Sequence, residues 1–265
     1  MIRILHHSKI FKLLPLFSLA VLLLFSCKEE EDDELLITRT NSNQTAQDTS
    51  ITHTTKNSFV DSRDGNRYTF ITIGEQVWMQ ENLKYLPAVV GSDSSSLKKP
   101  LYYVYGYQGT DTNAAKRSQF YMDYGVLYNF AAATIGGVRD PELSNRVQGI
   151  CPEGWHLPSD IEWTALSNFL GGRPVAGGKL KATDTTHWKS PNAAATNEFG
   201  FSGLGGGFRA TGGSFEDWRT GGYWWSSTEN GSDYAWFRNM YFSNGDLYRI
   251  EFQKASGFCV RCIRD

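Results

Sequence analysis

The sequence contains few of the residues that build catalytic and metal centres. Among 265 residues it has 4 Cys and 5 His, and only His156 and His187 lie beyond residue 58. No G-x-S-x-G, H-E-x-x-H or phosphate-loop motif occurs, because the Gly-rich stretch at 203–213 lacks the Lys and following Ser/Thr of a phosphate loop. The sequence therefore predicts no catalytic residue and no bound metal, and it argues against an enzyme.

An excess of charge of one sign is also lacking. The chain has 26 Lys and Arg against 28 Asp and Glu, for a formal net charge of −2, and the basic residues form no stripe. Proteins that bind nucleic acids concentrate Lys and Arg on one face. Nucleic acid is therefore not an expected partner.

Long hydrophobic runs are limited to one, near the N-terminus. Residues 13–25 follow a basic segment and are fewer than the roughly 20 apolar residues that a membrane-spanning helix needs. The run ends in "LFSC", which resembles a bacterial lipobox, although Phe25 is bulkier than usual at its position. We predict a lipoprotein signal peptide over 1–26 and lipidation at Cys27, where each buried acyl methylene contributes about 0.8 kcal/mol to anchoring. The alternative is an uncleaved membrane anchor.

The next segment, 27–58, has few apolar residues to bury. Lys28 is followed by the acidic run "EEEDDE", which stays solvated. The run also resembles the signal that sends some bacterial lipoproteins to the outer face of the outer membrane. Residues 35–58 are rich in Thr, Asn, Ser and Gln and predict a flexible tether. We expect a lipid anchor in the outer membrane with the domain facing the cell exterior; a periplasm-facing anchor is the alternative.

Aromatic residues and glycine, in contrast, are abundant. The chain has 8 Trp, 13 Tyr and 26 Gly, which favours short strands, tight turns and irregular loops. Residues 59–265 are numerous enough for one large domain with its own core. Alternating patterns predict a hairpin that turns at Gly74-Glu75 and, near the C-terminus, strands at 223–228, 234–242, 247–252 and 257–263, with a turn at Asn244-Gly245.

A helix is predicted between these two groups of strands. Ser159 and Glu162 have the spacing of a capping box, and Gly171-Gly172 can end the helix. Its apolar face is predicted to hold Trp163, Leu166, Phe169 and Leu170. Strands at both ends with a helix between them indicate an α+β domain whose chain ends meet in one sheet.

Six motifs of this domain, in the same order, resemble one known family. They are "DSRDGNRYTFITIGEQVWMQENLKY", "GVLYNFAAA", "CPEGWHLPSDIEW", "NEFGFSGLGGGFR", "GGYWWSST" and "VRCIRD". This pattern is similar to the Fibrobacter succinogenes major paralogous domain, or FISUMP domain, from about Asp61 onwards. The chain departs from the family at Gly205, where a proline is usual, and at Cys259, where a serine is usual. The first departure predicts a looser loop.

The resemblance implies a fold and leaves the activity open. The family is similar in outline to C-type-lectin-like and formylglycine-generating-enzyme folds. In lectin-like folds a disulfide joins the first-helix region to the last strand, which implies a bridge between Cys151 and Cys262 in an oxidising compartment. Strand alternation places Cys262 with Phe258 and Val260, and Cys259 on the other face. The two cysteines of "CVRC" therefore do not chelate one metal ion, and we expect Cys259 to be a buried free thiol.

A lectin-like fold carries ligand sites on its loops, and the aromatic loops supply the candidates. Sugar rings stack on Trp and Tyr, and nearby Asp, Asn and Arg donate or accept hydrogen bonds. We predict ligand contact by Trp218, Arg219, Tyr223, Asp233 and Trp236. Buried core positions are the alternative for every Trp here, and above all for Trp224 and Trp225, which alternation places on opposite faces.

The predicted function is the binding of a glycan or a surface protein by a non-catalytic domain, attached to the membrane only through its lipid. Two alternatives stay open: a structural subunit of a cell-surface assembly, and a copper oxidase of the formylglycine-generating type. No cofactor is required. Asn244 and Asp246 carry oxygens that could bind calcium, but the geometry of a hairpin turn explains an Asn-Gly-Asp sequence by itself.

Overall fold

Strands from the two ends of the domain pair in one sheet. Its order is β1-β2-β3-β14-β8, so the C-terminal β14 lies between β3 and β8. The β2/β3 hairpin turns at Gly74, where a φ of 61° suits glycine. This confirms the predicted hairpin and the meeting of the chain ends. The strands are β1 (Ser58–Val60), β2 (Arg67–Ile73), β3 (Gln76–Met79), β8 (Trp155–His156) and β14 (Ile263–Arg264).

A second sheet, in the order β10-β9-β11-β12-β13, contains the Trp-rich strands. Its neighbours are antiparallel, except for the parallel contact of β11 with β9. The strands are β9 (Gly206–Arg209), β10 (Phe215–Trp218), β11 (Gly221–Asn230), β12 (Tyr234–Tyr241) and β13 (Tyr248–Gln253). Two short pairs accompany it: β4 (Tyr102–Tyr103) with β5 (Leu127–Tyr128), and β6 (Arg139–Asp140) with β7 (Arg146–Val147).

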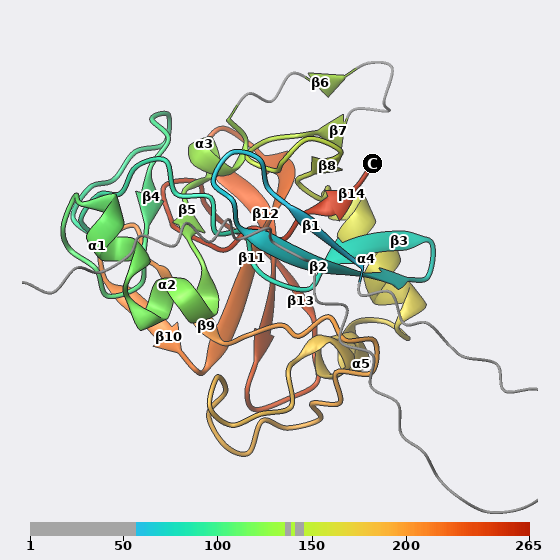
Figure 1. Cartoon of the computed structure of the whole chain (residues 1–265). Coiled ribbons are helices and arrows are strands. Elements are labelled where there is room, and N and C mark those ends of the chain that lie inside the picture. The colour runs from blue at the N-terminus through green and yellow to red at the C-terminus, as the bar shows by residue number, and fades with distance from the viewer. Residues whose placement is uncertain (1–56, 136–138, 141–145) are drawn as a thin grey trace, which may run out of the picture. The chain divides into compact units, whose positions relative to one another are not determined.

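The helices lie beside the sheets. They are α1 (Thr112–Lys116), α2 (Gln119–Tyr124), α3 (Phe130–Ala133), α4 (Asp160–Phe169) and α5 (Arg173–Leu180). In Figure 1, α1 and α2 lie at the left beside β10, and α4 lies at the right near β3. The mixture of sheets with a few helices confirms the α+β class.

Helix α4 begins as the sequence predicts. Ser159 accepts from the backbone of Glu162, whose side chain accepts from the backbone of Ser159, so the capping box is formed. Trp163, Leu166 and Leu170 are buried, but Phe169 is 55% exposed. The prediction that Phe169 belongs to the buried face was wrong, because the face of α4 that contacts the core is narrower than the predicted apolar face. The Phe169 ring lies at the border of that face and meets Phe199 edge-on at 5.8 Å.

The central strand of the second sheet, β11, is buried on both faces over its first six residues. Trp224 packs in one apolar core with Trp163, and Trp225 packs in the other with Phe130 and Phe258. Both tryptophans are fully buried, on opposite faces as strand alternation requires. Because both faces are covered, the alternation of side chains along β11 shows which core each residue enters. It does not show which residues are exposed and could contact a ligand.

The C-terminal segment 257–263 keeps the predicted alternation without forming a continuous strand. Phe258 and Cys259 make isolated bridges to Tyr128 and Trp224, and β14 begins only at Ile263. Phe258, Val260 and Cys262 nevertheless enter one core, while Cys259 and Ile263 enter the other.

Several irregular loops are fixed by buried cations that bind backbone carbonyls. The Lys181 ammonium donates to the carbonyls of Ala193, Tyr241 and Asn244 over 2.7, 2.9 and 2.8 Å. Burial lowers the pKa of Lys181 to about 8, which still leaves the side chain protonated at neutral pH. The buried Arg209 binds the carbonyls of Ser92, Ser94 and Ala255 in a similar way. These contacts satisfy carbonyls that no strand or helix pairs.

The computed structural model describes residues 57–135, 139–140 and 146–265, which lie in the unit His53–Asp265. The predicted signal peptide 1–26, the lipidation site Cys27 and the tether up to residue 56 are outside the described residues. Within the described part of the chain, no helix is long and apolar enough to cross a membrane.

Candidate ligand-binding surface

The five residues predicted to contact a ligand do not form one site. Trp218 ends β10 and Arg219 follows it, whereas Asp233 lies in the turn between β11 and β12. Gly221 pairs with Tyr241 at one end of the β11/β12 hairpin, and Asn230 pairs with Tyr234 at the other. Strand β12 covers this span in seven steps (241 − 234), so at about 3.3 Å per residue the two ends are about 23 Å apart. Trp218 and Asp233 therefore cannot share a small ligand.

Tyr223 is a supporting residue and not a stacking platform. It is 4% exposed, and its ring lies 4.6 Å from that of Phe208 and 5.4 Å from that of Phe258. Its hydroxyl donates to the carboxylate of Asp217. Burial and this hydrogen bond raise the pKa of Tyr223 well above its usual range. The prediction of ligand contact by the ring was wrong, because β11 is covered on both faces; the residue instead fixes Asp217.

Asp233 and Trp236 lie away from Trp218 and Tyr223, and each has different contacts. Asp233 is exposed in the hairpin turn, and its carbonyl accepts from the backbone of Lys254 over 2.8 Å. The Arg249 guanidinium lies 3.5 Å from the centre of the Trp236 ring and covers one of its faces. Trp236 is thus half-buried and does not offer that face to a sugar.

Trp218 is the residue best placed to contact a ligand. It is 45% exposed. Its indole Nε1 donates to the hydroxyl of Tyr124 over 3.2 Å, and Phe120 meets the ring edge-on at 5.5 Å. These two contacts hold the indole in one orientation without covering it. An exposed aromatic ring that is already fixed loses little conformational entropy when a ligand stacks on it.

The backbone around Trp218 adopts a conformation that non-glycine residues rarely take. Asp217 and Arg219 have φ values of 59° and 61°. Such left-handed residues cost of order 1 to 3 kcal/mol each and concentrate at functional sites. The surroundings hold this conformation: the Arg219 N–H donates to Gly205 over 2.7 Å, and the Lys189 N–H donates to the Arg219 carbonyl over 2.6 Å. Trp218 is presented by a strained but well-supported turn.

Gly205 explains how these segments come so close. A Cβ at this position would lie 2.8 Å from the His187 carbonyl oxygen and 3.1 Å from the Arg219 Cα. The 2.8 Å distance is shorter than real Cβ atoms show, so a side chain here would force the neighbouring backbone of this chain to shift. The expectation of a looser loop at this departure from the family pattern was therefore wrong: the loop is tightly packed.

Polar groups lie beside the indole and beside Tyr124, which holds it. The His187 ring lies 5.7 Å from that of Tyr124, and its Nδ1 pairs with the Asp184 carboxylate over 2.8 Å. The Arg219 guanidinium lies 5.7 Å from the Trp218 ring centre and donates to the Thr185 carbonyl over 2.5 Å. We call the set Trp218, Arg219, Tyr124, His187 and Asp184 the Trp218 surface. It combines one aromatic plane with donors and acceptors at its rim.

Sequence reasoning found two members of the Trp218 surface and missed the other three. Tyr124 and Trp218 are 94 residues apart, and no periodic pattern connects them. The aromatic row also continues from Phe120 to Tyr105 at 5.0 Å and on to Phe215 at 4.9 Å. Only the tertiary packing of α2 against β10 brings these residues together.

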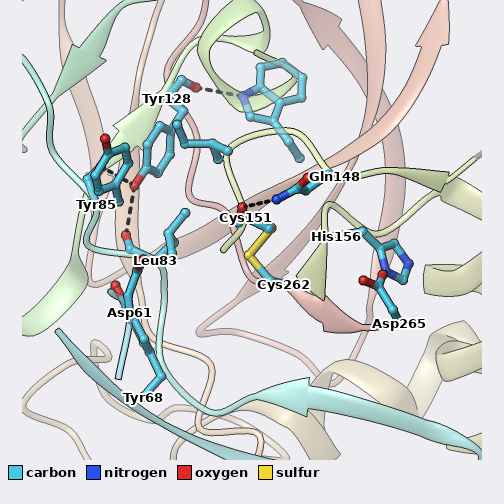
Figure 2. The surroundings of a disulfide bond; sticks show 12 residues. Asp61, Tyr68, Leu83, Tyr85, Tyr128, Gln148, Cys151, His156, Cys262 and Asp265 are labelled. Carbon is cyan, nitrogen blue, oxygen red and sulfur yellow. Dashed lines mark hydrogen bonds and ion pairs between the residues drawn. A yellow bond between two sulfur atoms is a disulfide. The ribbon is translucent and has the colours of Figure 1, made fainter. Parts of the chain in front are cut away.

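The cysteines adopt the predicted arrangement. Cys151 and Cys262 form a disulfide with an S–S length of 2.06 Å (Figure 2). Cys259 is free and buried, and its sulfur lies 3.3 Å from the Asn82 amide nitrogen. Burial raises the pKa of the Cys259 thiol to about 12. A thiol with this pKa carries almost no thiolate at neutral pH, and thiolate is the reactive form.

A second polar cluster lies near the C-terminus. The ring nitrogens of His156 pair with Glu162 over 2.8 Å and with Asp265 over 2.7 Å (Figure 2 shows His156 beside Asp265). The Glu162 carboxylate also serves the α4 cap, and hydrogen bonds from His156 and Ser159 outweigh burial and lower its pKa. Each of these groups is paired with another group of the cluster. The cluster therefore has a structural role, which is to connect α4 to β8 and to the C-terminal Asp265.

The Asn244-Gly245 turn is held by its own contacts. The Asn244 side-chain oxygen accepts from the Asp246 backbone over 3.0 Å, and the Asp246 carboxylate accepts from Arg173 over 3.2 Å. Across residues 57–135, 139–140 and 146–265, no three His, Cys, Asp or Glu side chains form a group that could hold a metal ion.

One comparison with known proteins is informative. The family model described as the Fibrobacter succinogenes major domain matches residues 71–264. No curated protein and no solved structure matches the chain.

Proposed function

The chain belongs to the Fibrobacter succinogenes major domain family, and we propose that it is a non-catalytic binding protein that recognises a glycan through the Trp218 surface. The observation that carries this proposal is the half-exposed indole of Trp218, fixed by Tyr124 on a turn with two left-handed residues. Strained backbone of this kind concentrates at functional sites, and a fixed, exposed ring is ready to stack on a ligand.

A glycan suits the chemistry of this surface. The C–H face of a sugar ring can stack on the indole, while the hydroxyls at the ring edge can reach Arg219, His187 and Asp184. A lectin-like arrangement, with ligand sites on irregular loops beside a sheet, is part of the proposal. Supporting it are the sheet that joins the chain ends, the capped α4 and the disulfide from Cys151 to the C-terminal segment.

The cell address forms the second part of the proposal. Cys27 would carry the lipid, and the acidic run and the tether would present the domain on the exterior of the outer membrane. The disulfide supports an oxidising compartment outside the cytosol. The membrane would be contacted through the lipid alone.

A surface assembly is the second candidate function. The row Trp218, Phe120, Tyr105 and Phe215 is longer than one sugar ring needs, and it could pack against a partner protein. The oxidase alternative has less support. It needs two neighbouring thiolates, but Cys262 is bonded to Cys151 and Cys259 is a buried thiol with a raised pKa.

A glycan array probed with the full chain tests the proposal. Replacing Trp218 and Arg219 by Ala should weaken binding to the best glycan at least about tenfold. The unfolding free energy should change by no more than about 1 kcal/mol, since both side chains are partly exposed. Tyr234→Ala is the matched control: this aromatic residue is 40% exposed at the opposite end of the β11/β12 hairpin.

The control variant should bind like the unmodified chain. Binding that survives loss of Trp218 and Arg219 would refute the Trp218 surface as the site. A chain that binds no glycan at all would favour the partner-protein function.

A further inference from the structure

Strand β13 forms one edge of the second sheet, and its outward backbone groups can be identified. The Lys254 N–H donates to the Asp233 carbonyl, which makes these two residues a hydrogen-bonded pair in the β12/β13 register. Hydrogen-bonded pairs alternate along an antiparallel ladder, so Ile250 also points its N–H and C=O inward. Arg249 and Glu251 therefore point theirs outward. Among the residues that the structure describes, these outward groups of Arg249 and Glu251 have no partner.

The sequence of this edge is complementary to itself in one antiparallel register. Suppose that a second copy of β13 pairs with the first about a two-fold axis at Ile250. Arg249 of each copy then faces Glu251 of the other copy. Both are outward-pointing residues, so the pairing gives four backbone hydrogen bonds. An axis at Arg249 or at Glu251 would place like charges opposite each other, which is destabilising. A shift by one residue would pair outward groups with inward ones.

We propose that two copies of this chain associate through β13, edge to edge and antiparallel about Ile250. Edge strands usually resist such pairing by carrying charges. Here the two charges alternate in sign, so they attract in this register.

The side chains are arranged for this contact. Ile250 is 40% exposed and would meet Ile250 of the second copy. The Arg249 side chain is already ordered by ion pairing with Asp160 over 2.8 Å and by its stacking on Trp236. Its ordering before association reduces the entropy lost in forming an ion pair with Glu251 of the second copy.

The dimer would leave both ligand surfaces free. In the strand order β10-β9-β11-β12-β13, the Trp218 surface is at the β10 edge and the pairing edge is at the other. Two copies would form a continuous ten-stranded sheet with a ligand site at each end. Such a dimer would bind a repeating ligand with avidity. A six-residue edge gives a small interface, so association should be reversible in solution.

Cysteine cross-linking of the purified full chain tests the register. In the proposed dimer, residue 250 is directly opposite itself in a non-hydrogen-bonded pair, with Cβ atoms about 4.5 to 5.5 Å apart. Ile250→Cys should therefore form a disulfide-linked dimer under mild oxidation, seen on non-reducing gels. Glu251→Cys is the matched control on the next residue, and it should give at least tenfold less dimer because its two copies are not opposite. Equal yields from the two variants would overturn the proposal.

Charge exchange provides an independent test by sedimentation. Glu251→Arg and Arg249→Glu should each abolish self-association, because like charges then face each other. A mixture of the two variants should associate again, because two arginines on one strand then face two glutamates on the other. Glu251→Arg retains the Arg249–Asp160 ion pair. Its thermal unfolding midpoint should therefore equal that of the unmodified chain, which shows that the fold is intact.

Two results would refute the proposal in this form. Association that persists in both charge variants would indicate another interface. A monomer in which the Arg249 and Glu251 amides exchange slowly with deuterium would indicate that another segment of the chain, such as residues 35–56, covers the edge. Neither result bears on glycan binding, because no test variant changes the Trp218 surface.

Discussion

Removing the Cys151–Cys262 disulfide should cost this domain a large part of its stability. The bridge joins residues 111 apart in sequence. In the chain-entropy model, closing a loop of this length removes about 16 cal/mol/K from the unfolded state, which corresponds to about 4.8 kcal/mol at 25 °C. Native strain and residual structure lower the measured value, so we expect a loss of about 3 to 5 kcal/mol. Many domains have only 5 to 15 kcal/mol in total.

Equilibrium unfolding in urea measures this loss. Cys151→Ala and Cys262→Ala should each destabilise by that amount, and the double variant should cost little more than either, because all three remove the same bridge. Cys259→Ala is the internal control. It deletes one small buried sulfur that accepts a hydrogen bond from Asn82, and it should cost about 1 kcal/mol or less.

Two outcomes would refute this reasoning. If the losses of the Cys151 and Cys262 variants add in the double variant, the two residues act through separate contacts and the shared bridge is not the cause. If Cys259→Ala costs as much as Cys262→Ala, packing of the C-terminal segment dominates and the constraint on the unfolded chain is secondary. Mapping of unreduced peptides should in addition show a 151–262 cross-link and one thiol that is alkylated only after unfolding.

Three further predictions concern separate parts of the chain. Burial raises the pKa of Asp160, but hydrogen bonds from Arg249 and Arg238 lower it overall. The ionised Asp160 therefore stabilises the fold above the usual carboxyl pKa, and this stabilisation is lost as pH falls through the lowered pKa of the folded state. Asp160→Asn should cost about 3 kcal/mol at pH 7, since it leaves Arg238 buried without an anion, and should flatten the acid limb of stability measured by urea unfolding. Lys181→Met should cost about 3 kcal/mol or more in the same assay because three carbonyls lose their donor, whereas Lys179→Met, in a partly exposed ion pair, should stay within about 0.5 kcal/mol. Labelled palmitate should be incorporated into the full chain, and Cys27→Ala should abolish the labelling.

The sequence predicts the local features of the fold because short-range patterns determine them. The Ser159–Glu162 capping box needs only a three-residue spacing, and the β2/β3 hairpin needs only a turn between alternating residues. The segment 257–263 shows the limit of such patterns. Its alternation is preserved, but the Val260 carbonyl accepts from Leu83, in a loop, instead of from a strand. The alternation of residues 257–263 thus predicts a continuous strand, whereas the structure has isolated bridges in this segment.

The ligand surface is less predictable for two physical reasons. Tyr223 and Trp218 flank the same Gly221-Gly222 pair in the sequence, but β11 is covered on both faces and the end of β10 is not. Periodicity reports which residues share a face and does not report whether another layer covers that face. Tyr124 and His187, which complete the surface, come from α2 and from an irregular loop, and only long-range packing places them next to Trp218.

The loop that carries His187 shows how a surface made of irregular segments can be rigid enough to bind. The Lys181 ammonium fixes the carbonyls of Ala193, Tyr241 and Asn244, and the buried Asn192 side chain donates to the carbonyls of Ala182 and Asp184 over 2.8 and 3.2 Å. These bonds replace the ladder that a strand would have provided, so the loop is ordered before any ligand arrives. Because ordering during binding would reduce affinity, residues such as Lys181 should influence recognition from inside the protein without touching the ligand. Lys181→Met should therefore weaken binding at the Trp218 surface as well as lower stability, whereas Asp160→Asn, on the α4 side of the sheet, should lower stability alone.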